Sequence, residues 1–305
     1  MKVGIIGLGR MGNAIAYRLI NAGHDVIGFD LNMHARAELV AMGGTAVDSL
    51  EHIAAAARIF WLMVPVAAVD TVIHELKKYS KAGDIFIDGG NSYFEDSIRR
   101  AHELAQHKIF FLDCGTSGGV YGRTQGFCLM VGGDETMYTK VYELLAAIAA
   151  PGGVARVGSS GTGHYVKMVH NGIEYGLMQA YAEGMQLIKD GCFKSEQLDL
   201  EEITRIWNTS SIIRSFILEL MHNIFTQDQD LNSIRGKVDS TGMGKWTVQE
   251  AHKAKVPVPV IEEALHVREW SQQTGGNYAT KLVALLRQQF GGHPIHTIGE
   301  EHENS

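Results

Sequence analysis

Short, almost wholly apolar runs alternate with amphipathic segments through the first half of the chain. Each run has the length of a strand that is buried on both faces, and each following segment has helical periodicity. Repeated strand–helix units of this kind are typical of a parallel sheet covered by helices on both sides. The predicted strands are 2–7, 24–29, 58–64, 84–88, 109–113, 127–131 and 154–157, and the predicted helices are 13–22, 33–41, 66–79, 96–107 and 136–149. We therefore predict an α/β fold, with a Rossmann-like doubly wound parallel sheet in residues 1–158.

The strand pattern ends after Gly158, and only helical periodicity follows. Residues 163–190 have the pattern of one long helix, residues 232–242 that of a loop, and 299–305 that of a frayed tail. Further helices are predicted at 200–207, 212–225, 244–254, 260–274 and 278–290. We expect residues 159–305 to form an all-α C-terminal domain. Several amphipathic helices on so small a domain leave apolar surface uncovered, so a homodimer or homotetramer is expected.

A glycine-rich turn, Gly7-Leu8-Gly9-Arg10-Met11-Gly12, joins the first predicted strand to the first predicted helix. In this G-x-G-x-x-G pattern the first glycine makes the turn, the second lets the backbone approach a pyrophosphate, and the third allows close helix–strand packing. The second strand ends at Asp30, whose carboxylate can bind the adenosine ribose hydroxyls and would repel a 2′-phosphate. Asp30 could also cap the next helix, which is compatible with ribose binding. The turn and Asp30 together predict a dinucleotide site that takes NAD.

Two further loops follow predicted strands, Gly89-Gly90-Asn91-Ser92 and Gly115-Thr116-Ser117-Gly118-Gly119. Ligands of open α/β sheets bind beyond the carboxyl ends of the strands, where both loops are expected. Glycine, asparagine and serine are also ordinary turn residues, so each loop alone is ambiguous. Their shared position at the cofactor end of one sheet favours a site.

The long predicted helix carries polar chemistry on one face. Lys167, His170, Asn171, Glu174 and Met178 recur at helical spacing, next to the apolar positions 166, 169, 173 and 177. Lys167 and Glu174 could be partners in a solvated stripe. The apolar neighbours favour an inward-facing functional face instead, because buried charge is costly unless it is paired or used.

Composition limits the classes of protein that fit. The chain has 305 residues, 45% hydrophobic and 20% charged, and a net charge of −7, which argues against a nucleic-acid partner. Its three cysteines lack metal-ligand spacing and indicate reduced thiols in the cytoplasm. We expect no secretory signal, because Gly7, Gly9 and Arg10 interrupt the first apolar run. We expect no membrane segment either, because the most membrane-like window, 59–69, is too short and contains Pro65. No metal-ligand cluster is evident in the sequence, so no metal site is expected.

Several motifs together resemble the decarboxylating 6-phosphogluconate dehydrogenases of the pentose phosphate pathway. They are Asp88-Gly89-Gly90-Asn91-Ser92-Tyr93, Ser117-Gly118-Gly119, the stretch from His164 to Tyr175, and Gly244-Lys245-Trp246-Thr247. The resemblance covers essentially the whole chain, and the length matches the short form of the family. Short forms with an acid at the position of Asp30 resemble the NAD-preferring ones.

The resemblance implies a catalytic pair. The lysine that matches Lys167 takes the proton of the substrate C3 hydroxyl while hydride leaves C3, so its pKa must fall from about 10.4 toward roughly 7–8. The protonated lysine then polarises the 3-keto group while CO2 departs. The glutamate that matches Glu174 protonates C1 of the resulting enediol, which gives ribulose 5-phosphate.

The resemblance also implies binding residues for a phosphorylated sugar acid and for the cofactor. Sugar and carboxylate contacts carry over to Asn91, Ser117, Gly118, Gly119, His170 and Asn171, and phosphate contacts to Tyr175 and Arg268. Arg287 and His293 match residues that reach into the neighbouring subunit's site, and Val64 and Asn91 match cofactor contacts. Residues 159–305 would thus hold the substrate-binding domain.

Four positions, at three sites in the chain, depart from the longer enzymes of the family. Thr241 stands where a phosphate-binding lysine is found there, Val120 replaces an acid, and Gly126-Phe127 replaces Pro-Ser. One alternative is a non-decarboxylating β-hydroxyacid dehydrogenase of the 3-hydroxyisobutyrate type, but Lys-x-x-Asn-Asn is usual there and His170 precedes Asn171 here. A non-catalytic dinucleotide sensor is the other, and it has no need of Lys167 and Glu174.

Overall fold

The computed structural model describes residues 1–240 and 242–298, and the chain forms two compact units, Met1–Lys167 and the segment from Met168 onward. Thr241, one of the departures noted above, and the tail 299–305 lie outside the described residues. The predicted domain boundary at residue 158 precedes the long helix, whereas the compact units divide within it.

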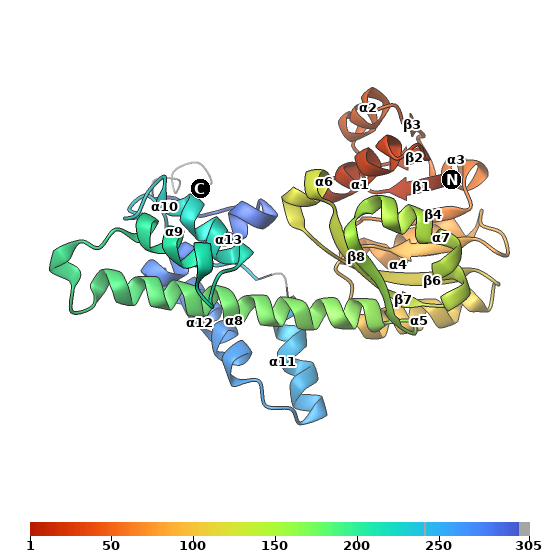
Figure 1. Cartoon of the computed structure of the whole chain (residues 1–305). Helices are drawn as coiled ribbons and strands as arrows, with labels where there is room; N and C mark the ends of the chain where they lie inside the picture. The colour runs from red at the N-terminus through yellow and green to blue at the C-terminus, as the bar shows by residue number, and fades with distance from the viewer. Residues whose placement is uncertain (241, 299–305) are drawn as a thin grey trace, which may run out of the picture. The chain divides into compact units, whose positions relative to one another are not determined.

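The first unit is built on an eight-stranded sheet with the order β3-β2-β1-β4-β5-β6-β7-β8 (Figure 1). The strands are β1 (Lys2–Ile6), β2 (Asp25–Phe29), β3 (Thr45–Ala46), β4 (Ile59–Leu62), β5 (Ile85–Asp88), β6 (Phe110–Ser117), β7 (Phe127–Gly133) and β8 (Ala149–Gly158). From β3 to β6 all neighbouring strands are parallel. The carboxyl ends of β1, β2, β4, β5 and β6 therefore lie along one edge of the sheet.

One pair of strands departs from the predicted parallel sheet, because β6 and β7 are antiparallel. The connection between them holds only the short helices η1 (Gly119–Tyr121) and α6 (Gly122–Gln125). A parallel crossover needs a dozen residues or more, so the chain turns back instead. The sequence also failed to predict β3 and α3 (Leu50–Ala56), which are too short to show a clear period.

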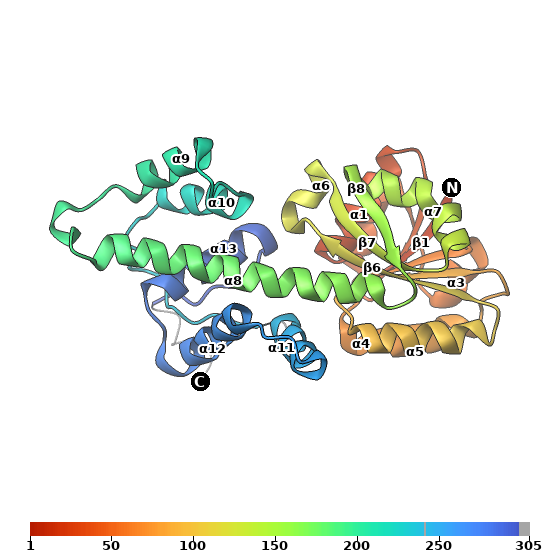
Figure 2. The same ribbon diagram turned by 60° about the horizontal axis from the view of Figure 1, so that its bottom comes forward.

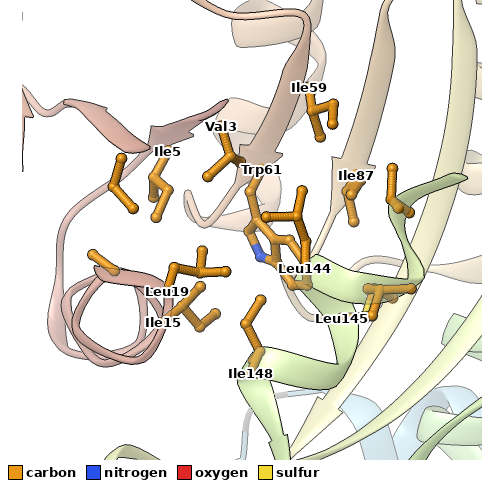
Figure 3. Packing of buried hydrophobic residues seen from close by; sticks show 14 of the residues in the cluster. Val3, Ile5, Ile15, Leu19, Ile59, Trp61, Ile87, Leu144, Leu145 and Ile148 are labelled. Carbon is orange, nitrogen blue, oxygen red and sulfur yellow. The ribbon is translucent and has the colours of Figure 1, made fainter. Parts of the chain in front are cut away.

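Helices cover both faces of this sheet. α1 (Arg10–Asn21), α2 (Met33–Ala41) and α7 (Glu135–Ile148) pack on one face, and α3, α4 (Val66–Lys77) and α5 (Phe94–Ala105) on the other. Successive strand residues alternate between the two cores: Trp61 packs with α1 and α7, whereas Phe60 faces α3 and α4. Figure 3 shows Trp61 surrounded by Leu144, Ile148 and the other side chains of its core. Burial on both faces explains the near-continuous apolar strands.

Polar caps set where several helices begin. The side chains of Asn32, Ser49, Asp134, Asp199, Ser215 and Asn277 accept hydrogen bonds from first-turn N–H groups. The cap at Ser215 explains why α10 (Phe216–Phe225) begins later than the predicted residue 212.

The long helix α8 (Thr162–Asp190) starts directly on the backbone of β6 and β7. A Cβ on Gly163 would lie 2.4 Å from the carbonyl oxygen of Met130, so only glycine fits there. The buried carboxylate of Asp113 accepts hydrogen bonds from the N–H groups of Gly161 (2.6 Å) and His164 (2.9 Å). A carboxylate at a helix N-terminus also interacts favourably with the helix dipole.

The second unit contains the rest of α8 and further helices (Figure 1), as predicted for an all-α segment. They are η2 (Lys194–Glu196), α9 (Leu200–Ser210), α10, α11 (Met243–Ala254), α12 (Pro259–Thr274) and α13 (Tyr278–Gly291). α11 packs closely on α8, since a Cβ on Gly244 would lie 2.4 Å from the Tyr175 ring. The Thr247 hydroxyl donates to the carbonyl oxygen of Met168 (2.7 Å). The Gly244-Lys245-Trp246-Thr247 motif is therefore a packing contact that supports α8.

Large apolar side chains of this unit stay exposed. On α8, Ile173 is 52% and Leu177 46% exposed, and Ile206, Ile212, Phe216 and Val260 are exposed on or beside other helices. Among residues 1–240 and 242–298 the helices are too short or too polar to cross a membrane.

Candidate active site

The glycine turn after β1 has the geometry that the sequence predicts. Gly7 has a φ of +93°, and a Cβ there would lie 2.4 Å from the carbonyl oxygen of Met63. A Cβ on Gly12 would lie 2.0 Å from the carbonyl oxygen of Gly7, so α1 packs against the turn at van der Waals distance. Around Gly9, in contrast, there is open space within 4 Å. The first and third glycines are required by packing, and the second leaves room for a ligand to approach the backbone.

The N-terminus of α1 faces that open space without a side-chain cap. First-turn N–H groups and the helix dipole form a ready anion site at such a terminus. The residues present thus fit the pyrophosphate of a dinucleotide, with Gly7 to Gly12 as its cradle.

Asp30 lies at the end of β2, and its carboxylate is fixed by two backbone groups. Oδ2 accepts a hydrogen bond from the N–H of Leu8 (2.6 Å), and Oδ1 accepts one from the N–H of Asn32 (2.8 Å). The cap of α2 is Asn32, whose side chain accepts from the N–H of His34, so the alternative that Asp30 caps this helix is wrong. Each carboxylate oxygen keeps a further lone pair for a ribose hydroxyl.

A pocket of about 610 Å³ flanks the glycine turn. Besides Leu8, Gly9, Arg10 and Gly119, it is lined by residues that the sequence did not single out, among them Asn13, Asn32, His34, Glu38, Met42 and Arg123. Arg123 donates to Asn13 (2.6 Å), and Asn13 donates to Glu38 (3.1 Å). The only signal in the sequence for Asn13 was a polar residue directly after the glycine motif, and no local pattern marked Arg123.

The loops after β4 and β5 lie beside the glycine turn. A Cβ on Gly7 would lie 3.1 Å from Val64 Cγ1, and a Cβ on Gly90 would lie 3.4 Å from the carbonyl oxygen of Val64. Asn91, at the tip of the next loop, is exposed. The structure therefore places Val64 beside the turn. The cofactor contacts expected of Val64 and Asn91 stay a prediction.

The Ser117-Gly118-Gly119 loop ends β6 at the same edge of the sheet. Gly118 and Gly119 have φ values of +135° and +51°, which favour glycine. Two residues before Ser117, a Cβ on Gly115 would lie 2.4 Å from Lys167 Cβ. This close approach places Lys167 beside the end of β6, and its side chain is only 6% exposed.

The polar face of α8 is partly buried. Met178 is fully buried, Glu174 is 22% exposed, and His170 Nδ1 lies 3.8 Å from Glu174 Oε2 and 3.1 Å from Asn171 Oδ1. The apolar positions beside this face were expected to leave little room for a solvated side of the helix, but Ile173 and Leu177 are exposed. Lys167 and Glu174 are nevertheless two turns apart on one unbroken helix.

Two buried arginines surround Tyr175 in the second unit. The guanidinium of Arg268 lies 3.2 Å from the centre of the Tyr175 ring, and the Tyr175 hydroxyl lies 3.3 Å from Ser240 Oγ. Burial and the neighbouring Arg287 cation lower the pKa of Arg268, while Tyr175 and Glu174 oppose that shift. Burial likewise lowers the pKa of Arg287. Among the described residues, Arg268 Nη2 is buried without a hydrogen-bond partner. Two desolvated cations and an open donor are well suited to bind an anion.

The expected contribution of Arg287 to a neighbouring subunit's site stays a prediction. Arg287 lies close enough to Tyr175 and Arg268 of its own chain to interact with them electrostatically. His293 follows the end of α13, where its ring centre is 6.4 Å from that of Phe290. Its expected role at a partner's site stays a prediction.

A pyrophosphate turn at β1 and a buried amine beside the end of β6 are what a dinucleotide-dependent dehydrogenase requires. This is the class of protein that the fold and the site define.

The family follows from comparison with known proteins. Residues 2–172 match the family model of the NAD binding domain of 6-phosphogluconate dehydrogenase, and residues 163–302 match that of its C-terminal domain. The chain belongs to the 6-phosphogluconate dehydrogenase family. The predicted fold class and nicotinamide cofactor are confirmed.

Individual relatives agree with this family. The NAD(+)-dependent, decarboxylating 6-phosphogluconate dehydrogenase of Haloferax volcanii is 42% identical over 302 residues, which cover 97% of this chain and 98% of that protein. The structure of Plasmodium falciparum 6-phosphogluconate dehydrogenase has a TM-score of 0.82 at 29% identity and is matched over 90% of this chain but only 62% of its own. A Salmonella typhimurium 3-hydroxyisobutyrate dehydrogenase shares the fold, with a TM-score of 0.76 at 23% identity over 93% of this chain and 99% of its own.

Proposed function

We propose that the protein oxidises and decarboxylates 6-phosphogluconate to ribulose 5-phosphate and CO2 with reduction of NAD. The observation that carries this proposal is the pairing of buried Lys167 with Glu174 on one helix. The turn from Gly7 to Gly12 and Asp30 would hold the nicotinamide cofactor, which would supply the acceptor for the hydride from C3 of the substrate. A plain β-hydroxyacid dehydrogenase needs no acid at position 174.

Lys167 is the proposed general base. Its neutral amine takes the proton of the C3 hydroxyl as hydride leaves, and the Lys167 side chain is buried beside the end of β6. The resulting ammonium then donates a hydrogen bond to the 3-keto oxygen. This polarisation draws the electrons of the C1–C2 bond toward the ketone, so CO2 leaves and an enediol forms.

Glu174 is the proposed acid that protonates the former C2 carbon, which is C1 of the enediol. His170 lies 3.8 Å from the Glu174 carboxylate and belongs with Asn171 to the proposed set that binds the sugar hydroxyls. Asn91, Ser117, Gly118 and Gly119 complete that set. Tyr175, Arg268 and Arg287 form the proposed phosphate site, and Thr241 leaves it without a third cation at that position.

The test is an absorbance assay for NADH with 6-phosphogluconate, run with NAD and with NADP, while released CO2 is trapped. We expect NADH and CO2 in equal amounts. NADH without CO2 would instead indicate a plain β-hydroxyacid dehydrogenase. No reduction of either cofactor would refute the proposed substrate.

Asp30 is expected to control the choice between NAD and NADP. In an Asp30→Asn variant the charge that repels a 2′-phosphate is lost, as are charge-assisted ribose bonds that contribute about 1.5–3 kcal/mol each. We expect the ratio of kcat/KM for NAD to that for NADP to fall about tenfold or more. The ratio is the proper measure because Asp30 also holds the N–H of Leu8, and loosening that turn affects both cofactors. An unchanged ratio would mean that discrimination lies elsewhere.

Glu174 is expected to matter after hydride transfer. A Glu174→Gln variant should form NADH in a single turnover yet release ribulose 5-phosphate about 10²-fold or more slowly, because the enediol lacks its proton donor. Exposed Glu183 on the same helix provides the matched control, Glu183→Gln. If Glu174→Gln mainly lowered the melting temperature, its role would be structural.

We also propose that the protein is a cytoplasmic homodimer or homotetramer and that residues 159–305 hold the substrate and the subunit interface. The exposed apolar side chains of the second unit support association through its helices. Cys114, Cys128 and Cys192 are all free thiols, which supports a reducing compartment.

A further inference from the structure

Helix α5 presents two buried polar side chains one turn apart. Ser97 is 0% and Arg100 2% exposed, and at i and i+3 they share one face of the helix. Buried polar groups are costly unless they are hydrogen-bonded or paired, and both side chains have such partners. Figure 2 shows α5 beside the sheet, close to the start of α8.

Arg100 holds the carboxylate that shapes the 89–92 loop. Arg100 Nη1 lies 3.3 Å from Asp88 Oδ2, and both side chains are buried. Asp88 in turn accepts hydrogen bonds from the N–H of Gly90 (3.1 Å) and from Ser92 Oγ (2.7 Å). Arg100 Nε also donates to Asp70 on α4 (2.7 Å), which fixes the guanidinium from a second side. The loop that carries Asn91 is thus anchored to α5 through one ion pair.

Ser97 holds the first turn of α8. Its hydroxyl lies 2.7 Å from His164 Nδ1, and His164 is 1% exposed. Lys167 follows His164 by three residues on the same helix, so a shift of His164 moves Lys167 with it.

Apolar contacts run alongside the Ser97 bond. The rings of Phe94 and Tyr165 meet edge to face, with centres 5.2 Å apart. A Cβ on Gly161 would lie 2.6 Å from Ile98 Cγ1, so the turn before α8 rests directly on α5. One helix therefore contacts both the 89–92 loop and the segment that bears Lys167.

We propose that Ser97 and Arg100 are positioning residues, which make α5 a rigid spacer between Lys167 and the loop that carries Asn91. This inference rests on the proposed function, in which Lys167 is the base and Asn91 contacts cofactor and substrate. Hydride transfer requires reacting atoms about 3–3.5 Å apart, and a misplacement of 1 Å can cost about 10²-fold in rate. A spacer fixed at both ends by buried contacts meets that requirement.

The first test is Ser97→Ala, which removes one oxygen atom and leaves the apolar contacts of α5 in place. We expect kcat to fall about tenfold or more, because Lys167 loses its placement. NADH affinity, measured by fluorescence titration, should stay within about twofold. The isotope effect on kcat with substrate deuterated at C3 should not decrease, since hydride transfer becomes slower. Ser80→Ala is the matched control, because Ser80 also donates a hydrogen bond, to the carbonyl oxygen of Leu76.

The second test compares neighbouring arginines. Arg100→Lys keeps the charge but loses the fork that joins Asp88 to Asp70, whereas Arg99→Lys changes an exposed residue that pairs with the same Asp70. We expect Arg100→Lys to weaken NADH binding and to lower kcat, and Arg99→Lys to leave both within about twofold. Arg100→Lys therefore tests the contact between α5 and the 89–92 loop, and Ser97→Ala tests the contact between α5 and the first turn of α8, which carries Lys167.

The outcomes separate the inference from the proposed function. A wild-type enzyme that is inactive with 6-phosphogluconate would refute the proposed function. NADH titration of Arg100→Lys would still test the contact between α5 and the 89–92 loop. An active wild type with unchanged kcat in Ser97→Ala, or unchanged NADH binding in Arg100→Lys, would overturn the inference. A loss of activity in Ser97→Ala that merely followed a lower melting temperature, with an unchanged rate below the transition, would overturn it as well.

Discussion

Replacement of Lys167 by methionine is expected to abolish NADH formation from 6-phosphogluconate and to leave NADH binding intact. Methionine fills nearly the same volume, so the packing of position 167 against Gly115 is kept while the amine is lost. General-base catalysis typically contributes about 10²–10⁴-fold, and Lys167 is also the proposed donor to the 3-keto group. We therefore expect kcat to fall by about 10³-fold or more.

Two measurements on Lys167→Met and one further variant serve as controls. NADH titration and the melting temperature show whether the nucleotide-binding unit is intact. Lys189→Met on the same helix removes a lysine that pairs with Asp230 at the surface, and should cost no more than about 1 kcal/mol of stability and no activity. A Lys167→Met enzyme that still reduced NAD at a substantial rate would refute the role of Lys167.

Arg268→Met is expected to have the second large effect, on substrate binding. Loss of one partner of a desolvated charge pair costs about 2–5 kcal/mol, and each 1.4 kcal/mol is about tenfold in affinity. We expect KM for 6-phosphogluconate to rise about 30-fold or more. The phosphate is remote from the carbons that react, so kcat should change less.

Stability offers an independent measurement for Arg268. Without an anion, Arg268 and Arg287 are two buried cations that disfavour each other. Arg268→Met should therefore not lower the melting temperature of the free protein by more than its lost packing. Inorganic phosphate should raise the melting temperature of the wild type but not of the variant. Exposed Arg205→Met is the control, and an equal phosphate effect in all three proteins would exclude Arg268 from the site.

The sequence predicted most elements of the fold but not their directions. The spacing of apolar residues and the positions of turn residues located the strands and helices, and α2 matches the predicted range 33–41. Period alone carries no information about strand direction, so the antiparallel pairing of β6 and β7 could not be predicted. The late start of α10 depends on the cap at Ser215, which competes with an apolar run that begins at Ile212.

Candidate site residues could be predicted where they form a pattern within a short stretch of sequence. Contacts that depend on packing between distant segments could not be predicted. The glycine turn, Asp30 and the polar positions of α8 are local patterns that can be read directly from the sequence. The bond between Ser97 and His164 joins residues 67 positions apart, and that between Arg123 and Asn13 joins residues 110 apart. No spacing rule connects such pairs, because only the folded sheet brings them together.

Because α8 is unbroken, insertions or deletions between Lys167 and Glu174 should not be tolerated. Lys167 and Glu174 lie on the same hydrogen-bonded helix, so the spacing of their backbone positions is fixed by the helical rise and turn per residue. One residue inserted between them would turn Glu174 by about 100° around the helix axis and move it off the face of the lysine. Homologues that keep this chemistry should therefore vary in side chains between the two positions but never in the number of residues.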